Sequence, residues 1–388
     1  MSVMTGSMVA SLVTVGRTLA LCACGLIFAR YRLGPEDAST WKTVARLNAE
    51  FITPCLCVGA ITKGVDPGVV SELWPVALLA IVLPCLWLAV GALGGVLFFS
   101  RDQRHYVTFS ALTVAYPNSF AIPYSLLLGL RRQVSWIETD PRGEEFMATV
   151  CMVFATLVLL QIWTVGFYFF GRAARYEERE KEVEVVAVAT AKEVDALETA
   201  AESGPAVAAA PVPQSLPSQG STCQGLQQML NPLVLSLIAA IILALTPLRQ
   251  PFIDSVLHEV FQFVGAASVP LILIQMGAGM ARPPSKALRS TALRIRTAIL
   301  ITLFRLVVGN ASGAAIIIGC RRAGWITDPI ISICLFLMSA SPTAANLMLV
   351  SGVQGAYVQP TSILLFCMQV AAVPLLTISV GIYVAILS

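Results

Sequence analysis

The chain has 388 residues, of which 57% are hydrophobic and only 12% are charged, and its mean hydropathy is +0.79. This composition is typical of polytopic membrane proteins and excludes an ordinary water-soluble domain. The net charge of +3 comes from lysines and arginines between apolar segments, so no nucleic-acid partner is expected.

About ten apolar segments approach the roughly 20 residues that a helix needs to span a bilayer. We therefore predict an all-α polytopic membrane protein. The first segment has no basic region before it and no small-residue cleavage site, so we interpret it as a retained helix. The expected spans, in chain order, are residues 8–29, 44–62, 74–99, 107–130, 146–170, 230–247, 261–280, 297–320, 329–350 and 360–387.

The distribution of basic residues predicts the orientation. If the N-terminus lies outside the cytosol, 16 lysines and arginines fall in cytosolic loops and 7 in outer loops. Because cytosolic loops are enriched in these residues, we expect both termini on the non-cytosolic side. Either the endoplasmic reticulum or the plasma membrane is compatible with the sequence.

A polar linker divides the chain. Residues 172–227 form an expected cytosolic linker, in which the Ala/Pro/Ser-rich part at 202–219 is predicted to be disordered. The remaining blocks, 1–171 and 228–388, hold five spans each. An odd number of spans gives the second block the opposite orientation, which is the inverted repeat of many secondary transporters.

Prolines interrupt the fourth and ninth segments at corresponding places. The fourth contains Pro117 and the ninth contains Pro342, whereas Pro54 and Pro270 in the second and seventh are interpreted as ordinary kinks. A proline within a helix removes a backbone donor and frees a carbonyl group. In lipid such groups must be satisfied within the protein or line a cavity. Paired interruptions therefore point to the substrate site of a carrier.

Four short motifs lie in or beside the apolar segments: Asn231-Pro232-Leu233, Gly265 to Pro270 with Met276-Gly277-Ala278, Ala340 to Asn346, and Pro117-Asn118. Their order and spacing resemble those of the auxin efflux carrier superfamily, especially its PIN-LIKES branch and fungal members. The fourth segment lacks the glycine that commonly precedes the asparagine in fungal and bacterial members.

The resemblance implies a fold and a mechanism. It implies ten helices in a 5+5 inverted repeat with crossed broken helices four and nine, an arrangement shared with bile-acid symporters and NhaA-type antiporters. Helices one, two, six and seven would form a scaffold, and the others a moving transport domain. Members of the superfamily move indole-3-acetic acid and similar organic anions by an elevator-like motion.

Polar groups at the breaks are the candidate substrate site. The first turn after each break exposes amides with partial positive charge, which suits a carboxylate. The asparagines could instead satisfy freed backbone groups. The candidate substrate-binding residues are Asn118, Asn346, Pro117, Pro342, Ser119, Thr343 and Gln275.

Three ionisable residues, Arg17, Glu50 and Arg305, lie within the apolar segments, and Glu50 and Arg305 are candidates for coupling or gating. Glu50 lies four residues after Arg46, so a local ion pair is the alternative to a gating role. Arg305 lies deeper in its segment, where it could attract an anion or pair with an acid.

Other classes lack their signatures. No aspartate lies within a span, as a sodium/proton antiporter would require, and no G-x-x-x-x-G-K-[ST] motif is present. His105 and His258 are the only histidines, and the closely spaced cysteines are poorly placed for a metal. We expect no enzyme activity, no cofactor and no metal site.

We therefore predict a secondary transporter for a small amphipathic organic anion, with an auxin-like carboxylate implied by the resemblance. The alternatives are a non-transporting membrane receptor or regulatory protein with the same fold, or a channel. The expected partners are the organic anion and membrane lipid, and a homodimer is left open.

Overall fold

The computed structural model describes residues 2–31, 38–65, 67–99, 105–131, 134–140, 142–175, 231–281 and 295–387. This part of the chain is almost entirely helical, and it contains no β-sheet beyond one isolated bridge. Most of the 172–227 linker lies outside the described residues. The fold is that of a polytopic membrane protein. Its six candidate spans are Ser39–Gly64, Trp74–Leu97, Gly143–Arg175, Val256–Ala281, Ala298–Arg322 and Val358–Leu387.

Helices overlap each of the expected segments, but not all are long. Expected segments four, six and nine contain shorter apolar helices of 10–17 residues, because the fourth and ninth are interrupted and the sixth ends early. The number of ten spans therefore stays a prediction. The helices of the first half are α1 (Ser2–Tyr31), α2 (Ala38–Leu47), α3 (Thr53–Gly64), α4 (Pro67–Val70), α5 (Trp74–Phe98), α6 (His105–Ala115), α7 (Ala121–Arg131), α8 (Ser135–Glu138) and α9 (Gly143–Gln161).

The second half follows the same pattern of long and interrupted helices. Its helices are α12 (Pro232–Leu245), α13 (Arg249–Ile253), α14 (Val256–Gly265), α15 (Ser268–Ala281), α17 (Ile295–Leu303), α18 (Asn310–Arg322), α19 (Pro329–Ala340), α20 (Asn346–Gln354) and α21 (Val358–Leu387). Extra residues form π-helical turns at Asn48–Ile52, Ile162–Gly166 and Phe304–Gly309.

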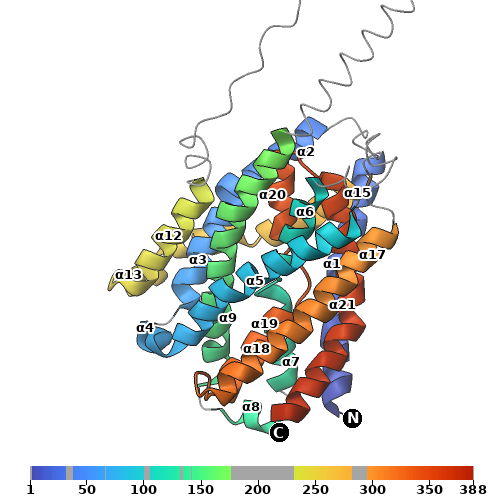
Figure 1. The fold of residues 1–388 in the computed structure, drawn as a ribbon. Helices are drawn as coiled ribbons and strands as arrows, with labels where there is room; N and C mark the ends of the chain where they lie inside the picture. Colours follow the sequence, from blue (N-terminus) through green and yellow to red (C-terminus); the bar gives the residue numbers. More distant parts are fainter. Residues whose placement is uncertain are drawn as a thin grey trace, which may run out of the picture.

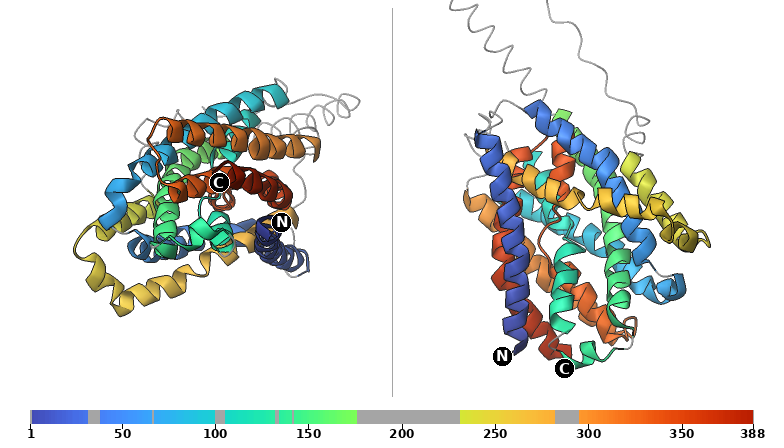
Figure 2. Two further views of the ribbon diagram at one scale, coloured as in Figure 1. Left: turned by 90° about the horizontal axis from the view of Figure 1, so that it is seen from below. Right: turned by 180° about the vertical axis from the view of Figure 1, so that it is seen from behind.

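The ends of the chain lie together. α1 begins and α21 ends at the same end of the bundle, and α8 lies there too (Figure 1). The helix that continues α9 ends at the opposite end, and α12 begins there, so the described residues on either side of the linker lie at the same end of the bundle. Seen from behind, α1 runs the length of the bundle beside α7 and α21 (Figure 2).

Close helix packing explains the glycine-rich segments. A Cβ atom on Gly277 of α15 would overlap the carbonyl oxygen of Cys22 in α1, so these two helices can cross closely only with glycine there. Gly91 and Gly95 of α5 face α6 in the same chain, since a Cβ atom on either would come 2.9 Å from an α6 Cα atom. The Gly91–Gly95 stripe is thus covered within the chain.

A buried polar contact joins the helices that carry Pro54 and Pro270. Thr53 Oγ1 lies 2.8 Å from Ser268 Oγ, and the Asn48 side-chain amide donates to the Ser268 carbonyl at 3.1 Å. All three residues are at most 1% exposed. Pro54 and Pro270 therefore lie beside a polar contact between the two halves, which proline kinks alone do not predict.

Candidate functional site at the crossing of two interrupted helices

The two helix breaks lie directly against each other. Pro117 and Thr343 form an isolated antiparallel bridge. The Asn118 amide donates to the Pro342 carbonyl at 2.6 Å, and the Ala344 amide donates to the Tyr116 carbonyl at 2.9 Å. The α6–α7 and α19–α20 helices thus meet at their interruptions, and each break satisfies backbone groups of the other.

Thr343 replaces the donor that proline removes. In an uninterrupted helix, the amide of residue 117 would donate to the carbonyl of Thr113, but Pro117 has no N–H. The Thr343 hydroxyl donates to that Thr113 carbonyl instead. Both threonines are fully buried. The structure therefore gives Thr343, expected to line the substrate site, a role in holding the crossing together.

Arg305 satisfies carbonyls on the other side of the crossing. Its Nη2 donates to the carbonyl oxygens of Ser339 at 3.0 Å and Ser341 at 2.9 Å, where α19 ends. Its guanidinium also lies 4.5 Å from the centre of the Trp87 ring. From the sequence we expected Arg305 to attract an anion or to pair with an acid. In the structure its partners are backbone carbonyls and an aromatic ring.

The candidate asparagines lie at the start of the second half-helices. Asn346 begins α20, and Asn118 and Ser119 precede α7. Both asparagine side chains are half-buried, and among the described residues neither has a side-chain hydrogen-bond partner. Ser119 is 9% exposed. The crossing thus offers two unengaged amide side chains, whereas the first-turn amides of Leu347 and Met348 in α20 donate to the carbonyls of Ala344 and Ala345 at 3.1 and 2.9 Å.

Gln275 lines a small cavity next to the crossing. The side chain is 4% exposed, and both of its amide atoms lack a hydrogen-bond partner in the described structure. The cavity volume is about 10 Å³, which is about the least that can hold one water molecule. Besides Gln275, its walls are Trp41, Ala45, Gly279, Met348, Gly352 and Val358. The cavity therefore lies among α2, α15, α20 and α21.

Among the described residues, Glu50 takes no part in the hydrogen bonds that join the two breaks. It is exposed on the π-helical turn Asn48–Ile52, and within the described chain it makes no ion pair with Arg46. The extra residue of the turn changes the spacing on which an i,i+4 pair depends. The structure thus removes the local-pair interpretation and leaves a gating role as a prediction.

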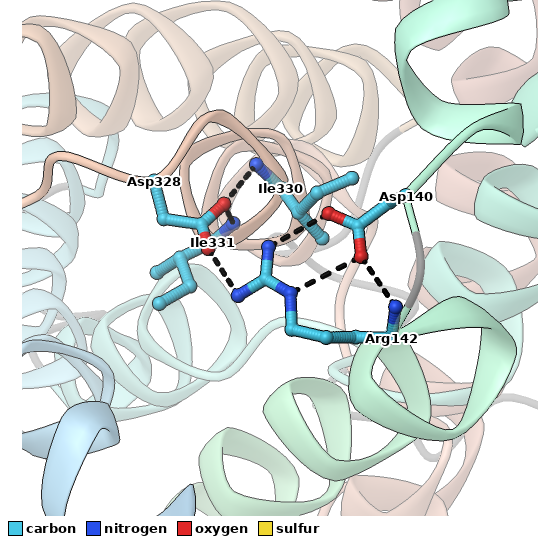
Figure 3. Close-up of polar contacts among 5 residues, drawn as sticks. All are labelled: Asp140, Arg142, Asp328, Ile330 and Ile331. Carbon is cyan, nitrogen blue, oxygen red and sulfur yellow. Dashed lines mark hydrogen bonds and ion pairs between the residues drawn. The ribbon is translucent and has the colours of Figure 1, made fainter.

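An ion cluster joins the two halves at the end where the termini lie. Arg142 donates through Nη2 and Nε to Asp140 at 2.7 and 3.1 Å, and its Nη1 contacts Asp328 (Figure 3). Asp328 also accepts the Ile330 amide at 2.7 Å and so caps α19. The hydrogen bond from Arg142 holds the pKa of Asp140 below its ordinary value, and the same contact raises the pKa of Arg142.

Sequence reasoning found the breaks but missed their supports. Trp87 and Thr113 carry no motif, since each acts through a partner far away in the chain. The same holds for the contact of Arg142 with Asp328 in the ion cluster. One signal was available: the carbonyl four residues before Pro117 had to find a new donor.

A nearly all-helical, apolar chain whose interrupted helices satisfy one another's backbone defines a polytopic integral membrane protein. Comparison with known proteins shows more. The sequence model of the membrane transport protein family matches residues 11–380. The chain belongs to this family, which is that of the auxin efflux carriers, and is a membrane transporter.

Two curated relatives agree with this assignment. The chain is 20% identical over 392 residues to the uncharacterized transporter C5D6.04 of Schizosaccharomyces pombe, covering 86% of this chain and 85% of the relative. It is 27% identical over 159 residues to Protein PIN-LIKES 2 of Arabidopsis thaliana, covering 39% of this chain and 34% of that relative. The resemblance that the sequence motifs suggested is confirmed.

Proposed function

We propose that this transporter is a secondary carrier that moves a small amphipathic organic anion, an auxin-like carboxylate, by elevator-type alternating access. The observation that carries the proposal is the crossing itself. Two half-helices begin there beside the unengaged side chains of Asn118 and Asn346.

The charge balance at the crossing supports an anion rather than a cation. The carbonyls at the breaks are occupied by Thr343, Arg305 and the amides of the opposite break. The asparagine side chains that are left over each offer an amide donor beside their own carbonyl oxygen, and the helix dipole is positive where α7 and α20 begin. Among the described residues, no aspartate or glutamate is buried, and Arg305 is the one buried charged side chain. Such a site favours a carboxylate.

Helix packing supports a moving unit and a fixed one. α1 packs on α15, and α3 packs on α12 and α14, which groups expected helices one, two, six and seven. α5 packs on α6 and α9, and α19 packs on α18, α9 and α21, which groups the others. The contacts of α1 with α7 and α21, and of α15 with α21, would form the interface between the two groups. This division corresponds to a scaffold and a transport domain in a ten-helix 5+5 inverted repeat, with blocks 1–171 and 228–388 and a cytosolic linker at 172–227. The termini would then lie on the non-cytosolic side.

The Gln275 cavity supports a movement between these groups. It lies where α15 of the scaffold faces α20 of the transport domain. An aromatic carboxylate exceeds its size, so the two faces must separate for the substrate to pass between them.

Uptake into proteoliposomes tests the proposal. We expect saturable uptake of labelled indole-3-acetate that other carboxylates inhibit. Asn118→Ala and Asn346→Ala should each reduce it, whereas Gln250→Ala, a change to an exposed amide bound to Asp254, should not. Absence of saturable uptake, or variants equal to wild type, would contradict the proposal.

Two further measurements separate the alternative functions. Shortening the 172–227 linker should leave the uptake of a carrier intact, whereas a regulatory protein that signals through the linker would lose its output. A channel would show unitary currents in a planar bilayer, and we expect none.

A further inference from the structure

Arg305 is a buried cation without an acidic partner. Its side chain is 1% exposed, and it lies within the candidate span Ala298–Arg322. Within the described residues it makes no ion pair, and its Nε and Nη1 have no hydrogen-bond acceptor. A charge inside a membrane protein is costly and marks a functional position by default.

The surroundings compensate this charge without an acid. Arg305 donates to the carbonyls of Ser339 and Ser341 at the C-terminal end of α19, where the helix dipole is negative. The face of Trp87 adds a cation–π contact at 4.5 Å. Trp87 is itself fixed, because its Nε1 donates to Ser312 Oγ at 3.0 Å.

Local backbone structure directs Arg305 inward and lets its partners approach. Arg305 lies in the π-helical turn Phe304–Gly309, and such single turns occur frequently at functional sites. A Cβ atom on Gly309 would come 2.7 Å from Arg305 Nη1. A Cβ atom on Gly313 would come 2.7 Å from Ser339 Oγ and 3.2 Å from the Trp87 ring. A larger side chain at Gly309 would displace the Arg305 guanidinium, and one at Gly313 would press on Ser339 of α19 and on Trp87.

We propose that Arg305 is a positioning residue that holds the end of α19 so that the Pro342 break stays in register with the Pro117 break. The contacts are consecutive along the chain. Arg305 binds the carbonyl of Ser341, and the next carbonyl, that of Pro342, accepts the Asn118 amide. Without Arg305, the carbonyls of Ser339 and Ser341 at the end of α19 lose their side-chain donor. The end of α19 is then less firmly held, and the hydrogen bonds that join the two breaks are weakened.

The consequence for transport rests on the proposed function. If the crossing binds an anion, a shift of the α19 end displaces Asn346 relative to Asn118. The positive charge of Arg305 also favours an anion nearby. Loss of Arg305 should therefore weaken substrate affinity more than it slows the turnover of bound substrate.

Hydrogen exchange measured by mass spectrometry in detergent tests the positioning role directly, because it needs no transport activity. The reporters are peptides that contain the amides of Asn118 and Ala344. Removing charge-assisted hydrogen bonds in Arg305→Gln should speed exchange of these amides by about tenfold to a hundredfold. Arg305→Lys keeps the charge but not the fork of donors, so it should give a smaller increase.

Arg249→Gln is the matched control. Arg249 also donates to two carbonyls at a helix end, Thr62 at 2.9 Å and Lys63 at 3.2 Å, but it lies at the end of α3 away from the crossing. It should leave exchange of the crossing amides unchanged. If folded Arg305→Gln and Arg305→Lys both exchange like Arg249→Gln, Arg305 does not position the crossing. If Arg305→Gln does not fold, Arg305→Lys alone decides.

The transport measurement separates the two proposals. Faster exchange in the Arg305 variants, together with a raised KM for uptake, supports both. Faster exchange in a protein whose wild type transports no anion would leave the positioning role standing and refute the proposed function. Unchanged exchange in the Arg305 variants, together with normal uptake by the wild type, would refute the positioning role and leave the proposed function standing.

Discussion

The hydroxyl of Thr343 offers a direct test of how the crossing is held together. Thr343→Val keeps the shape of the side chain but removes the donor to the Thr113 carbonyl. Pro117 leaves that carbonyl no other backbone donor from its own helix. The lost hydrogen bond and the unsatisfied buried acceptor together should cost about 1–3 kcal/mol. We expect the melting temperature in detergent to fall by several degrees, at roughly 2–4 °C per kcal/mol.

Thr377→Val is the matched control for this substitution. Thr377 is also buried, but its hydroxyl donates to Val373 in its own helix at 2.8 Å, so its loss should cost little. Thr343→Ser, which keeps the hydroxyl, should recover part of the stability. Equal melting temperatures for Thr343→Val, Thr377→Val and wild type would show that the hydroxyl does not replace the missing proline donor.

Three further predictions concern the ion cluster, the close helix crossing and the small cavity. The lowered pKa of Asp140, caused by Arg142, adds stability above the ordinary aspartate pKa and loses it as the pH falls through the lower folded-state value. The wild-type melting temperature should therefore decline on acidification below about pH 4. Asp140→Asn should show a smaller decline and a lower melting temperature at neutral pH. Glu72→Gln, the control, should show neither difference from wild type. An acid response of Asp140→Asn identical to wild type would contradict this. Gly277→Ala forces a methyl group into the backbone of α1 and should cost roughly 1–3 kcal/mol, measured by thermal unfolding; an unchanged melting temperature would refute the close crossing. Gln275→Met removes two unsatisfied buried amide atoms, so it should raise the melting temperature while reducing uptake; a gain in stability with full uptake would exclude Gln275 from the substrate route.

Membrane class, family and the positions of both breaks could be predicted from the sequence. Apolar segments and prolines are local signals, because hydropathy reports lipid exposure and Pro117 or Pro342 cannot continue a helix. Where the backbone is interrupted, the predicted segments are longer than the helices in the structure. Segment four divides into α6 and α7, and segment nine into α19 and α20.

The partners at the crossing could not be predicted, since they depend on distant parts of the chain. Thr343 and Thr113 are 230 residues apart, and nothing local shows that one supplies the donor the other lacks. Arg305 was recognised as an unusual charge, but its contact with carbonyls depends on a π-helical turn and on glycines that admit α19. Tertiary packing decides both.

Equilibrium binding of labelled indole-3-acetate to the purified protein tests the central claim most directly. We predict saturable binding that carboxylates displace and the neutral indole-3-acetamide does not. Asn118→Ala and Asn346→Ala should each weaken binding about tenfold or more, as expected for a lost hydrogen bond to a charged group. Equal displacement by indole-3-acetamide, with both variants binding like wild type, would contradict an anion site at the crossing.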